Sequence, residues 1–398
     1  MRLFEFEAKL LFSREKIAVP RSTLVSKHST DIGTLKVPVV IKAQTLSGNR
    51  AAHGGIIVVK KGTTAEILNS AHALIEKGVG KEKITSVLVE EFVADEEFQR
   101  YIALKWDTQT RGPVLLFSPK GGSGIEDRQE NAADALQTFP INMLQPKRSL
   151  TAIINKFCLG EKWLEFLMQL WQVFYSNDAN LVEVNPVFVL KNGSIIAGDG
   201  KVELNDLAEY RHPEWAEYPK RTLFLRQPTK MEEDAKKIND MDYRGVAGAS
   251  FFEFDGEIGI MASGGGASLL AMDALMASGL KPANYTEYSG NPSREKVAAL
   301  TKLVLSKKGL KGLWVVGGNA NFTDIFETLA GVMDGIEATK LVVKYPIVIR
   351  RGGPRWEEAF AMVRERAAKG KFDIELFGPD SPMLETVNVL VRKVKGKK

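Results

Sequence analysis

Two cations near the amino terminus are placed so that they could bind a polyphosphate. Lys42 belongs to the short apolar strand expected over Val37–Ala43, and Arg50 lies in the glycine-containing loop that follows. Cationic side chains beside flexible backbone suit phosphate groups. A lysine whose stem lies along apolar surface, with a surface arginine, is the alternative, and composition alone favours it. The sequence contains no GxxxxGK[ST] motif, so this is not a P-loop.

Three oxygen-bearing side chains, Glu183, Asn185 and Asp199, could hold Mg²⁺ that bridges phosphates. They lie in residues 180–204, which are expected to form a hairpin around Lys191-Asn192-Gly193. A three-residue loop with Gly193 in the left-handed conformation places Asn185 opposite Asp199, on one face with Glu183. A two-residue turn would point Asp199 the other way. A solvated polar hairpin face is the alternative to a metal site.

The carboxyl-terminal half carries residues suited to a carboxylate. Arg350-Arg351 precede Gly352-Gly353-Pro354, and the guanidinium fork of arginine matches a carboxylate. The run Asn321-Phe322-Thr323-Asp324 is expected to open a helix whose free N–H groups attract an anion. A surface turn and ordinary helix capping are the alternatives for these two motifs.

The elements of this half explain why its polar loops should meet. Five short strands alternate with helices, near residues 258–262, 284–288, 313–316, 347–349 and 374–377. This alternation predicts a doubly wound parallel sheet, in which every strand-to-helix loop lies at one edge. We therefore expect an anion or polycarboxylate site at that edge. A rival interpretation uses Gly264–Leu269 as a dinucleotide fingerprint with Glu287 on a ribose, but Leu269 stands where Gly or Ala is required.

The first half has a mixed α+β pattern. Apolar residues at 3, 6 and 10 predict an opening helix, and helices are also expected over 63–78 and 161–175. Strands are expected over 56–61, 86–93, 98–106 and 113–118. Residues 207–243 are rich in charge and proline, and are interpreted as a linker with little core. The expected domains are therefore 1–240 and 241–398.

Composition excludes several classes of protein. The 398 residues carry a net charge of +5, and residues 392–398 hold five basic residues, so the excess belongs to the tail and does not predict nucleic-acid binding. The lone cysteine, Cys158, lies in a mostly apolar run and is interpreted as a buried thiol. No apolar run reaches the length of a membrane span, and we expect a cytoplasmic protein.

Several motifs resemble a known superfamily. Leu3-Phe4-Glu5-Phe6-Glu7-Ala8-Lys9, Val39–Gln44, and Glu183–Pro186 with Asp199–Lys201 resemble the ATP-grasp-containing subunits of the succinyl-CoA synthetase superfamily. Tyr288–Ser293, Gly317–Thr323 and Arg350–Pro354 resemble its citrate-activating branch, which comprises ATP-citrate lyase and citryl-CoA synthetase. The resemblance implies an ATP-grasp domain followed by a doubly wound, flavodoxin-like parallel-sheet domain.

The resemblance also implies roles for individual residues. Residues that would bind nucleotide are Lys42 and Arg50 at the phosphates, Glu90, Phe92 and Val93 at the adenine, and Glu97 at the ribose. Asn185 and Asp199 would hold Mg²⁺, which selects the three-residue hairpin loop. Residues that would bind citrate are Ser289, Gly290, Asn321, Phe322, Thr323 and Arg351. The family's phosphate loop usually reads Arg-Gly-Lys, whereas this chain has Arg50-Ala51-Ala52 and lacks one cation.

The reaction implied is a phosphoryl relay. ATP phosphorylates a histidine, the phosphate passes to citrate, and coenzyme A displaces it to give citryl-CoA. The histidine and the main coenzyme A site would lie on a larger partner subunit, which is either separate from a citryl-CoA lyase module or fused to it. The absence of histidine from residues 241–398 agrees with this arrangement. Alternatives are a succinyl-CoA synthetase-type ligase subunit, a nicotinamide enzyme, and a non-catalytic citrate-sensing subunit, the last suggested by Ala51-Ala52.

Overall fold

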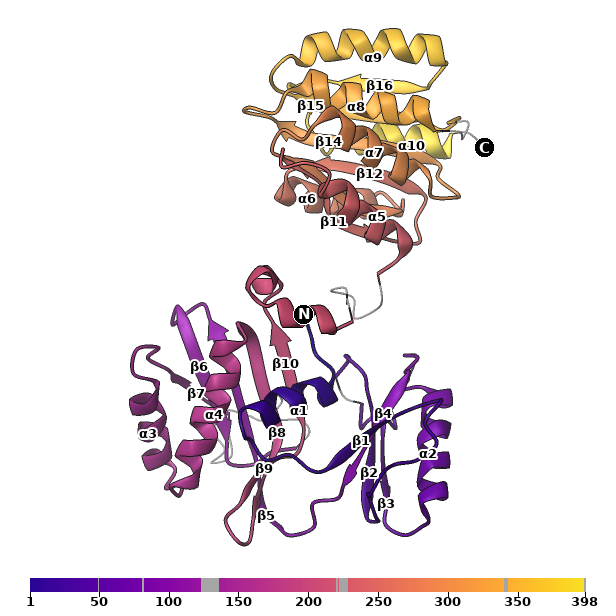
Figure 1. The fold of residues 1–398 in the computed structure, drawn as a ribbon. Coiled ribbons are helices and arrows are strands. Elements are labelled where there is room, and N and C mark those ends of the chain that lie inside the picture. The colour runs from indigo at the N-terminus through magenta and orange to yellow at the C-terminus, as the bar shows by residue number, and fades with distance from the viewer. Residues whose placement is uncertain are drawn as a thin grey trace. The chain divides into compact units, whose positions relative to one another are not determined.

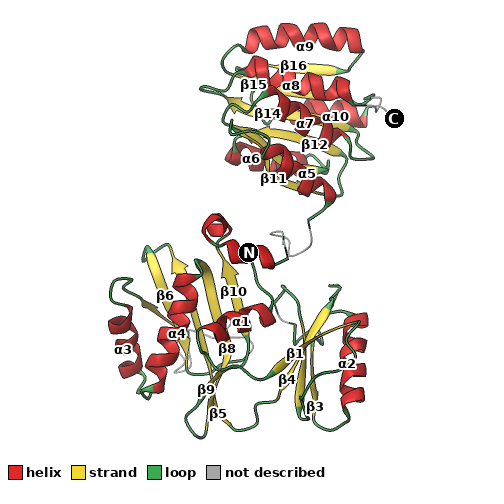
Figure 2. Cartoon of the chain, viewed as in Figure 1, coloured by secondary structure: helices red, strands yellow, loops and turns green. Residues whose placement is uncertain are grey.

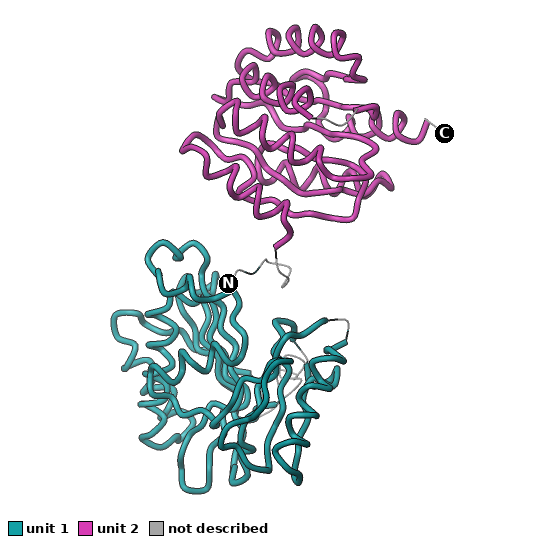
Figure 3. The backbone as a smooth tube through the Cα atoms, turned by 45° about the vertical axis from the view of Figure 1, so that its right-hand side comes forward, with its two compact units in different colours: residues 1–227 teal, residues 228–398 magenta. Residues whose placement is uncertain are grey.

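The computed structural model divides into two compact units, residues 1–227 and 228–398 (Figure 3). It describes residues 1–48, 50–80, 82–122, 136–219, 221, 228–339 and 343–396. Within these ranges, every helix is too short or too polar to cross a membrane. Each unit has its own hydrophobic core, so each is described by itself.

The first unit contains a four-stranded antiparallel sheet with the order β1-β4-β2-β3. Its strands are β1 (Ser22–Ser26), β2 (Val39–Ala43), β3 (Ile56–Val59) and β4 (Ser86–Glu91). Helix α2 (Thr64–Lys77) packs on this sheet through Ile67, Ala71 and Leu74 (Figure 1). The expected bounds of this helix are confirmed, because Thr63 caps its start and Gly78 follows its end with a φ of 72°.

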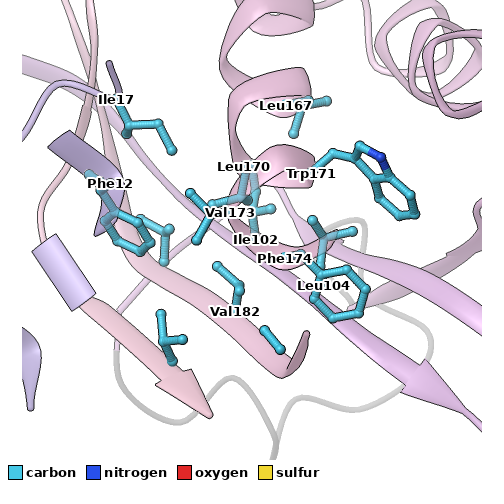
Figure 4. Packing of buried hydrophobic residues seen from close by; sticks show 14 of the residues in the cluster. Phe12, Ile17, Ile102, Leu104, Leu167, Leu170, Trp171, Val173, Phe174 and Val182 are labelled. Atoms are coloured by element: carbon cyan, nitrogen blue, oxygen red, sulfur yellow. The ribbon is translucent and has the colours of Figure 1, made fainter. Parts of the chain in front are cut away.

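A six-stranded sheet forms the rest of the first unit, with the order β10-β8-β5-β6-β7 and β9 paired to β8. Its strands are β5 (Glu96–Asp107), β6 (Gly112–Ser118), β7 (Gln137–Pro140), β8 (Ala179–Leu190), β9 (Ile195–Ala197) and β10 (Gly200–Leu204). Helices α3 (Pro146–Lys156) and α4 (Lys162–Ser176) cover it. Figure 4 shows Leu170 and Phe174 of α4 against Ile102 and Val182 of the strands. Cys158, expected to be buried, is exposed in the turn that follows α3.

Helix α1 (Glu5–Arg14) opens the chain as predicted, but its buried face differs from the one that its apolar spacing suggested. Leu10 is 53% exposed, whereas Ala8, Leu11 and Phe12 enter the core. Glu5 and Lys9 lie one turn apart and are also buried. The helix therefore inserts charged side chains into the first unit, and these belong to the candidate site.

The hairpin has the register of a three-residue loop. Gly200 pairs with Val184 and Ala197 with Val187, so Asn185 and Asp199 occupy opposing positions. Gly193 has a φ of 75°, and its N–H donates to the carbonyl of Leu190. The left-handed residue sets the loop length, and the loop length sets which side chains face each other.

The segment interpreted as a linker contributes to both cores. Two 3-10 helices, at Asp206–Arg211 and Pro213–Glu217, bury Ala208 and Trp215 in the first unit. Helix α5 (Lys230–Asn239) packs its Ala235 into the second unit's core. The division into two compact units falls between residues 227 and 228, so α5 belongs to the second unit. Because this segment is rich in charge and proline, its sequence did not indicate the few apolar residues that anchor each short helix in a core.

The second unit is a six-stranded sheet with the order β11-β13-β12-β14-β15-β16. Its strands are β11 (Val246–Glu253), β12 (Ile258–Ser263), β13 (Asn284–Ser289), β14 (Gly312–Asn319), β15 (Ile347–Gly352) and β16 (Ile374–Phe377). The last five are parallel and have the flavodoxin-like order, as predicted, whereas β11 is an antiparallel edge strand that was not predicted.

Helices cover both faces of this sheet (Figure 2). One face packs against α5, α7 (Arg294–Leu305), α8 (Ile325–Ala338) and α9 (Trp356–Gly370). The other packs against α6 (Gly265–Ala277) and α10 (Thr386–Lys395). The loops after the five parallel strands lie at the carboxyl edge of the sheet.

Candidate functional site

A buried cluster of charges in the first unit surrounds Lys42, which extends from the end of β2. Its Nζ lies 3.0 Å from Oε1 of Glu5 and pairs with Glu90 of β4. Lys9 of α1 contacts the same two carboxylates, at 2.8 Å from Glu5 and 2.5 Å from Glu90. Both lysines also donate to the carbonyl of Gly198, at 2.8 Å each. Two ammonium groups therefore share three acceptors.

Arg50 joins this cluster to the hairpin. Its Nη2 pairs with Glu5 and with Oδ2 of Asp199, the latter at 2.7 Å, while its Nη1 donates to the carbonyl of Ala43 at 2.8 Å. The loop folds back on itself, since the N–H of Gly55 donates to the carbonyl of Arg50. The two cations predicted at the phosphates are thus brought together on one carboxylate, Glu5, which the prediction had not assigned a role.

The charges in the cluster support one another. Burial would raise the pKa of Glu5, but Arg50, Lys42 and Lys9 outweigh it and hold this pKa well below its ordinary value. Burial would lower the pKa of Lys42 and of Arg50, but the carboxylates of Glu5 and Asp199 raise both. A triphosphate that binds these cations must therefore compete with Glu5.

Glu90 differs from Glu5 in its electrostatic balance. Burial raises the pKa of Glu90, and although Lys42 and Lys9 oppose this, Glu5 repels the charged form. Its carboxylate is occupied by the two lysines, and its backbone position in β4 pairs with Val40 of β2. Phe92 is exposed and Val93 partly exposed directly after β4, and Glu97 is exposed at the start of β5. Their contacts with adenine and ribose stay predictions.

The proposed magnesium ligands lie opposite each other on the hairpin, and both already have partners. The side-chain amide of Asn185 accepts from the N–H of Gly122 at 2.7 Å and donates to its carbonyl at 3.0 Å. Asp199 accepts from Arg50 and from the N–H of Gly200. Magnesium commonly uses one or two carboxylates together with phosphate oxygens and water. One carboxylate and one amide oxygen fit that pattern, with phosphates completing the shell.

This fit depends on the nucleotide. Within the described ranges, no group of three or more His, Cys, Asp or Glu side chains is arranged to hold a metal ion. The pair Asn185 and Asp199 would therefore bind magnesium together with phosphate rather than magnesium alone.

A second site lies in the other unit, at the carboxyl edge of its sheet, around Arg351 of β15. Arg351 is 1% exposed, yet its Nε and Nη2 have no hydrogen-bond partner among the residues that the structure describes. Its guanidinium lies over the ring of Tyr288, 5.5 Å from the centroid. The Tyr288 hydroxyl is likewise buried without a partner in the described ranges. Buried polar groups are nearly always paired, so unpaired donors of this kind indicate a ligand site.

The neighbouring arginine has a structural role. Arg350 points to the other face of β15, and its guanidinium donates to the carbonyls of Gly317, Pro379 and Ser381 at 2.8 to 3.0 Å. These bonds tie the ends of three strands together. Of the two adjacent arginines, Arg351 is therefore the one with donors to offer a carboxylate.

The helix expected to open at the run Asn321–Asp324 begins directly after it. Helix α8 starts at Ile325 and is capped by Asp324, whose side chain accepts from the N–H of Glu327 at 3.1 Å. The N–H of Ile325 donates to the carbonyl of Pro354. These N–H groups are therefore used within the protein, and the negative charge of Asp324 further weakens the attraction for an anion.

The remaining predicted citrate residues surround this edge. Asn321 and Phe322 are exposed in the loop before α8, and Thr323 is buried. Ser289 donates to Oε1 of Glu287 at 2.7 Å, and Gly290 follows it with a φ of 69°. Their contacts with a ligand stay predictions.

The sequence analysis missed Tyr288, although a signal for it was present. The side chains of β13 alternate between buried and partly buried positions, and Tyr288 falls on the buried face immediately before the loop. A phenol at a buried position next to polar loop residues is a candidate site residue, because a buried hydroxyl normally requires a partner.

Comparison with known proteins finds a family match in each unit. Residues 2–189 match the ATP-grasp domain family and residues 229–393 match the ATP citrate lyase citrate-binding family. A succinate–CoA ligase [ADP-forming] subunit beta of Staphylothermus marinus is 34% identical over 379 residues, covering 92% of this chain and 94% of that protein. A subunit of an ADP-forming sulfoacetate-CoA ligase of an Acholeplasma species is 29% identical, covering all of this chain and 93% of its own length.

The fold has a close counterpart among solved structures. The ATP citrate lyase of Methanothrix soehngenii, solved with citrate and coenzyme A, superposes with a TM-score of 0.75 over 98% of this chain and 99% of that chain, at 23% identity. At this identity the likeness concerns the fold. The ATP-grasp domain and the flavodoxin-like domain are both confirmed, together with a citrate-binding family match in the second unit.

Proposed function

Because the chain belongs to the family of succinate–CoA ligase β subunits, we propose that it is the nucleotide- and citrate-binding subunit of a citrate-activating acid–CoA ligase, of the ATP-citrate lyase or citryl-CoA synthetase type. One observation carries the choice of acid. The buried, unpaired guanidinium edge of Arg351 lies inside the segment that matches the citrate-binding family. A carboxylate would restore its missing hydrogen bonds.

The first unit would bind Mg-ATP. Lys42 and Arg50 would exchange Glu5 for phosphate oxygens, and Asn185 and Asp199 would hold magnesium beside them. When bound, magnesium neutralises phosphate charge and orients the γ-phosphate. The contacts of Lys42 and Arg50 with Glu5 keep the two cations close together before nucleotide binds, which reduces the entropy cost of ordering them.

The second unit would hold citrate while a partner supplies the phosphorylated histidine. Because residues 241–398 contain no histidine, a larger coenzyme A-binding subunit is proposed to provide it. Phosphate would pass from that histidine to citrate, and coenzyme A would then displace it to give citryl-CoA. A lyase module would convert citryl-CoA to acetyl-CoA and oxaloacetate, in the cytoplasm.

A succinate-activating ligase is the second candidate, since the relative from Staphylothermus marinus is named for succinate. The deciding experiment is to co-express the chain with its partner and measure coenzyme A-dependent ADP formation with citrate or with succinate. Turnover with citrate supports the proposal, and turnover with succinate alone supports the second candidate. Citrate binding with no ATP turnover would instead identify a citrate-sensing subunit.

A further inference from the structure

Tyr288 and Arg351 present adjacent unpaired donors on one face of the second unit's sheet. Tyr288 is fully buried at the end of β13, and Arg351 is 1% exposed at the end of β15. The guanidinium lies over the phenol ring, which carries its hydroxyl at the rim. Such a contact fixes the arginine by cation–π attraction while leaving the Nε and Nη2 edge unpaired.

Gly317 on β14 makes this arrangement possible. Strands β14 and β12 lie between β15 and β13, so the Arg351 side chain has to cross the end of β14 to approach Tyr288. A Cβ at position 317 would lie 2.1 Å from Nη1 of Arg351, which is closer than real contacts allow. The glycine therefore acts as a positioning residue that leaves room for the guanidinium.

We propose that Tyr288 is a specificity-determining residue whose hydroxyl binds the alcohol of a hydroxylated polycarboxylate, while Arg351 binds one of its carboxylates. The inference rests on the proposed function and deepens it, because it names the group that would separate citrate from succinate. Citrate carries an alcohol and a carboxylate on the same carbon, so one molecule can satisfy both neighbouring donors. Succinate has no alcohol and would leave the phenol unpaired.

The chemistry of the phenol suits this role. Burial raises the pKa of Tyr288, although Arg351 opposes this, so the hydroxyl keeps its proton at neutral pH and can donate. A site that hydrogen-bonds a substrate hydroxyl discriminates strongly against the analogue that lacks it, because the buried partner is then left unsatisfied.

The test compares citrate with tricarballylate, which is citrate without its alcohol, in calorimetric titrations of the full chain. Wild type should bind citrate more tightly than tricarballylate, by roughly 10- to 100-fold. Tyr288→Phe should remove this preference by weakening citrate alone, because the ring and its contact with Arg351 remain. Gly317→Ala should weaken both acids, because it displaces the guanidinium that binds their common carboxylate.

Thr286→Val is the matched control. Thr286 lies on the same face of β13, and its hydroxyl is also buried without a partner in the described ranges, so the variant removes a similar group one pleat deeper. It should keep the wild-type preference. Equal weakening of both acids by Tyr288→Phe, or an unchanged preference, would overturn the inference while leaving the proposed function in place. Failure of wild type to bind citrate would overturn the proposed function itself.

Discussion

At the scale of single residues, Glu5 is the buried anion on which three cations of the first unit converge. We expect Glu5→Gln to destabilise the chain by about 3–5 kcal/mol, because Lys9, Lys42 and Arg50 lose a shared buried partner. Because the change keeps the size of the side chain, the loss of unfolding free energy measures the effect of removing its charge. Urea denaturation measures it.

The control for this prediction is Glu76→Gln on the exposed side of α2, which should change the free energy of unfolding by less than about 0.5 kcal/mol. Equal unfolding midpoints for the wild type and the Glu5 variant would contradict the assigned role of this carboxylate.

Arg351 is expected to lower the stability of the unliganded chain while providing a contact for citrate. A buried guanidinium with an unpaired edge costs free energy when no ligand is bound, so Arg351→Met should stabilise the unliganded chain by about 1–4 kcal/mol. The same change should abolish citrate-dependent turnover while leaving ATP binding intact. Thermal unfolding without ligand measures the change in stability, and coenzyme A-dependent ADP formation by the chain assembled with its partner measures the turnover.

Arg364→Ala, at an exposed position on α9, serves as the comparison and should preserve citrate-dependent turnover. If Arg351→Met destabilised the unliganded chain, its guanidinium would have to be structurally paired. If the variant retained the wild-type KM for citrate, the assignment of the carboxylate site would be wrong.

At the scale of elements, a histidine stabilises the 3-10 segment 206–217. Burial would lower the pKa of His212, but hydrogen bonds to Asp178 at 2.7 Å and Glu214 at 2.8 Å raise it above 6.5. Arg211 also pairs with Asp178, and the imidazole stacks on Trp215. Because the folded pKa is the higher one, this stabilisation is complete below about pH 6.5 and is lost as the pH rises through the raised value.

The corresponding measurement compares the thermal unfolding midpoints of wild type and His212→Gln between pH 5.5 and 8.5. The difference in midpoint should be largest at the acidic end and should shrink as the pH rises. A difference that stays constant with pH would show that the histidine acts through packing alone.

Elements were predictable where one local residue dictates their geometry. Gly193 determines the hairpin loop and hence the pairing of Asn185 with Asp199, and Thr63 and Gly78 bound α2. Prediction failed where tertiary contacts decide. The run Asn321–Asp324 does not by itself show which of its residues caps α8; Asp324 does so, and it is also held by Arg355 and by Asn291.

The candidate sites were predictable in their residue types but less so in their pairings. Lys42 and Arg50 stand out as cations beside a flexible loop, yet Glu5, which binds both, lies 37 and 45 residues away along the chain. No local sequence pattern predicts such a contact. The same holds for Tyr288 and Arg351, which only the order of the parallel strands brings together.

At the scale of the whole molecule, the two units separate the proposed chemistry into phosphate activation and acid binding. The charge cluster around Lys42 lies within residues 5–199, whereas Tyr288, Gly317 and Arg351 lie within the second unit. Each unit also has a hydrophobic core of its own. The side chains described for each site therefore come from a single unit.

We therefore expect a fragment comprising residues 228–398 to fold and to bind citrate with a dissociation constant within about threefold of that of the full chain, a difference smaller than one ordinary hydrogen bond. Starting at 228 matters, because a fragment starting at 241 would lack α5 and expose the core that Ala235 fills. Circular dichroism and calorimetric titration test this, with the Arg351→Met fragment as the non-binding control. A fragment that folds but does not bind citrate would place part of the acid site on the first unit or on the partner subunit.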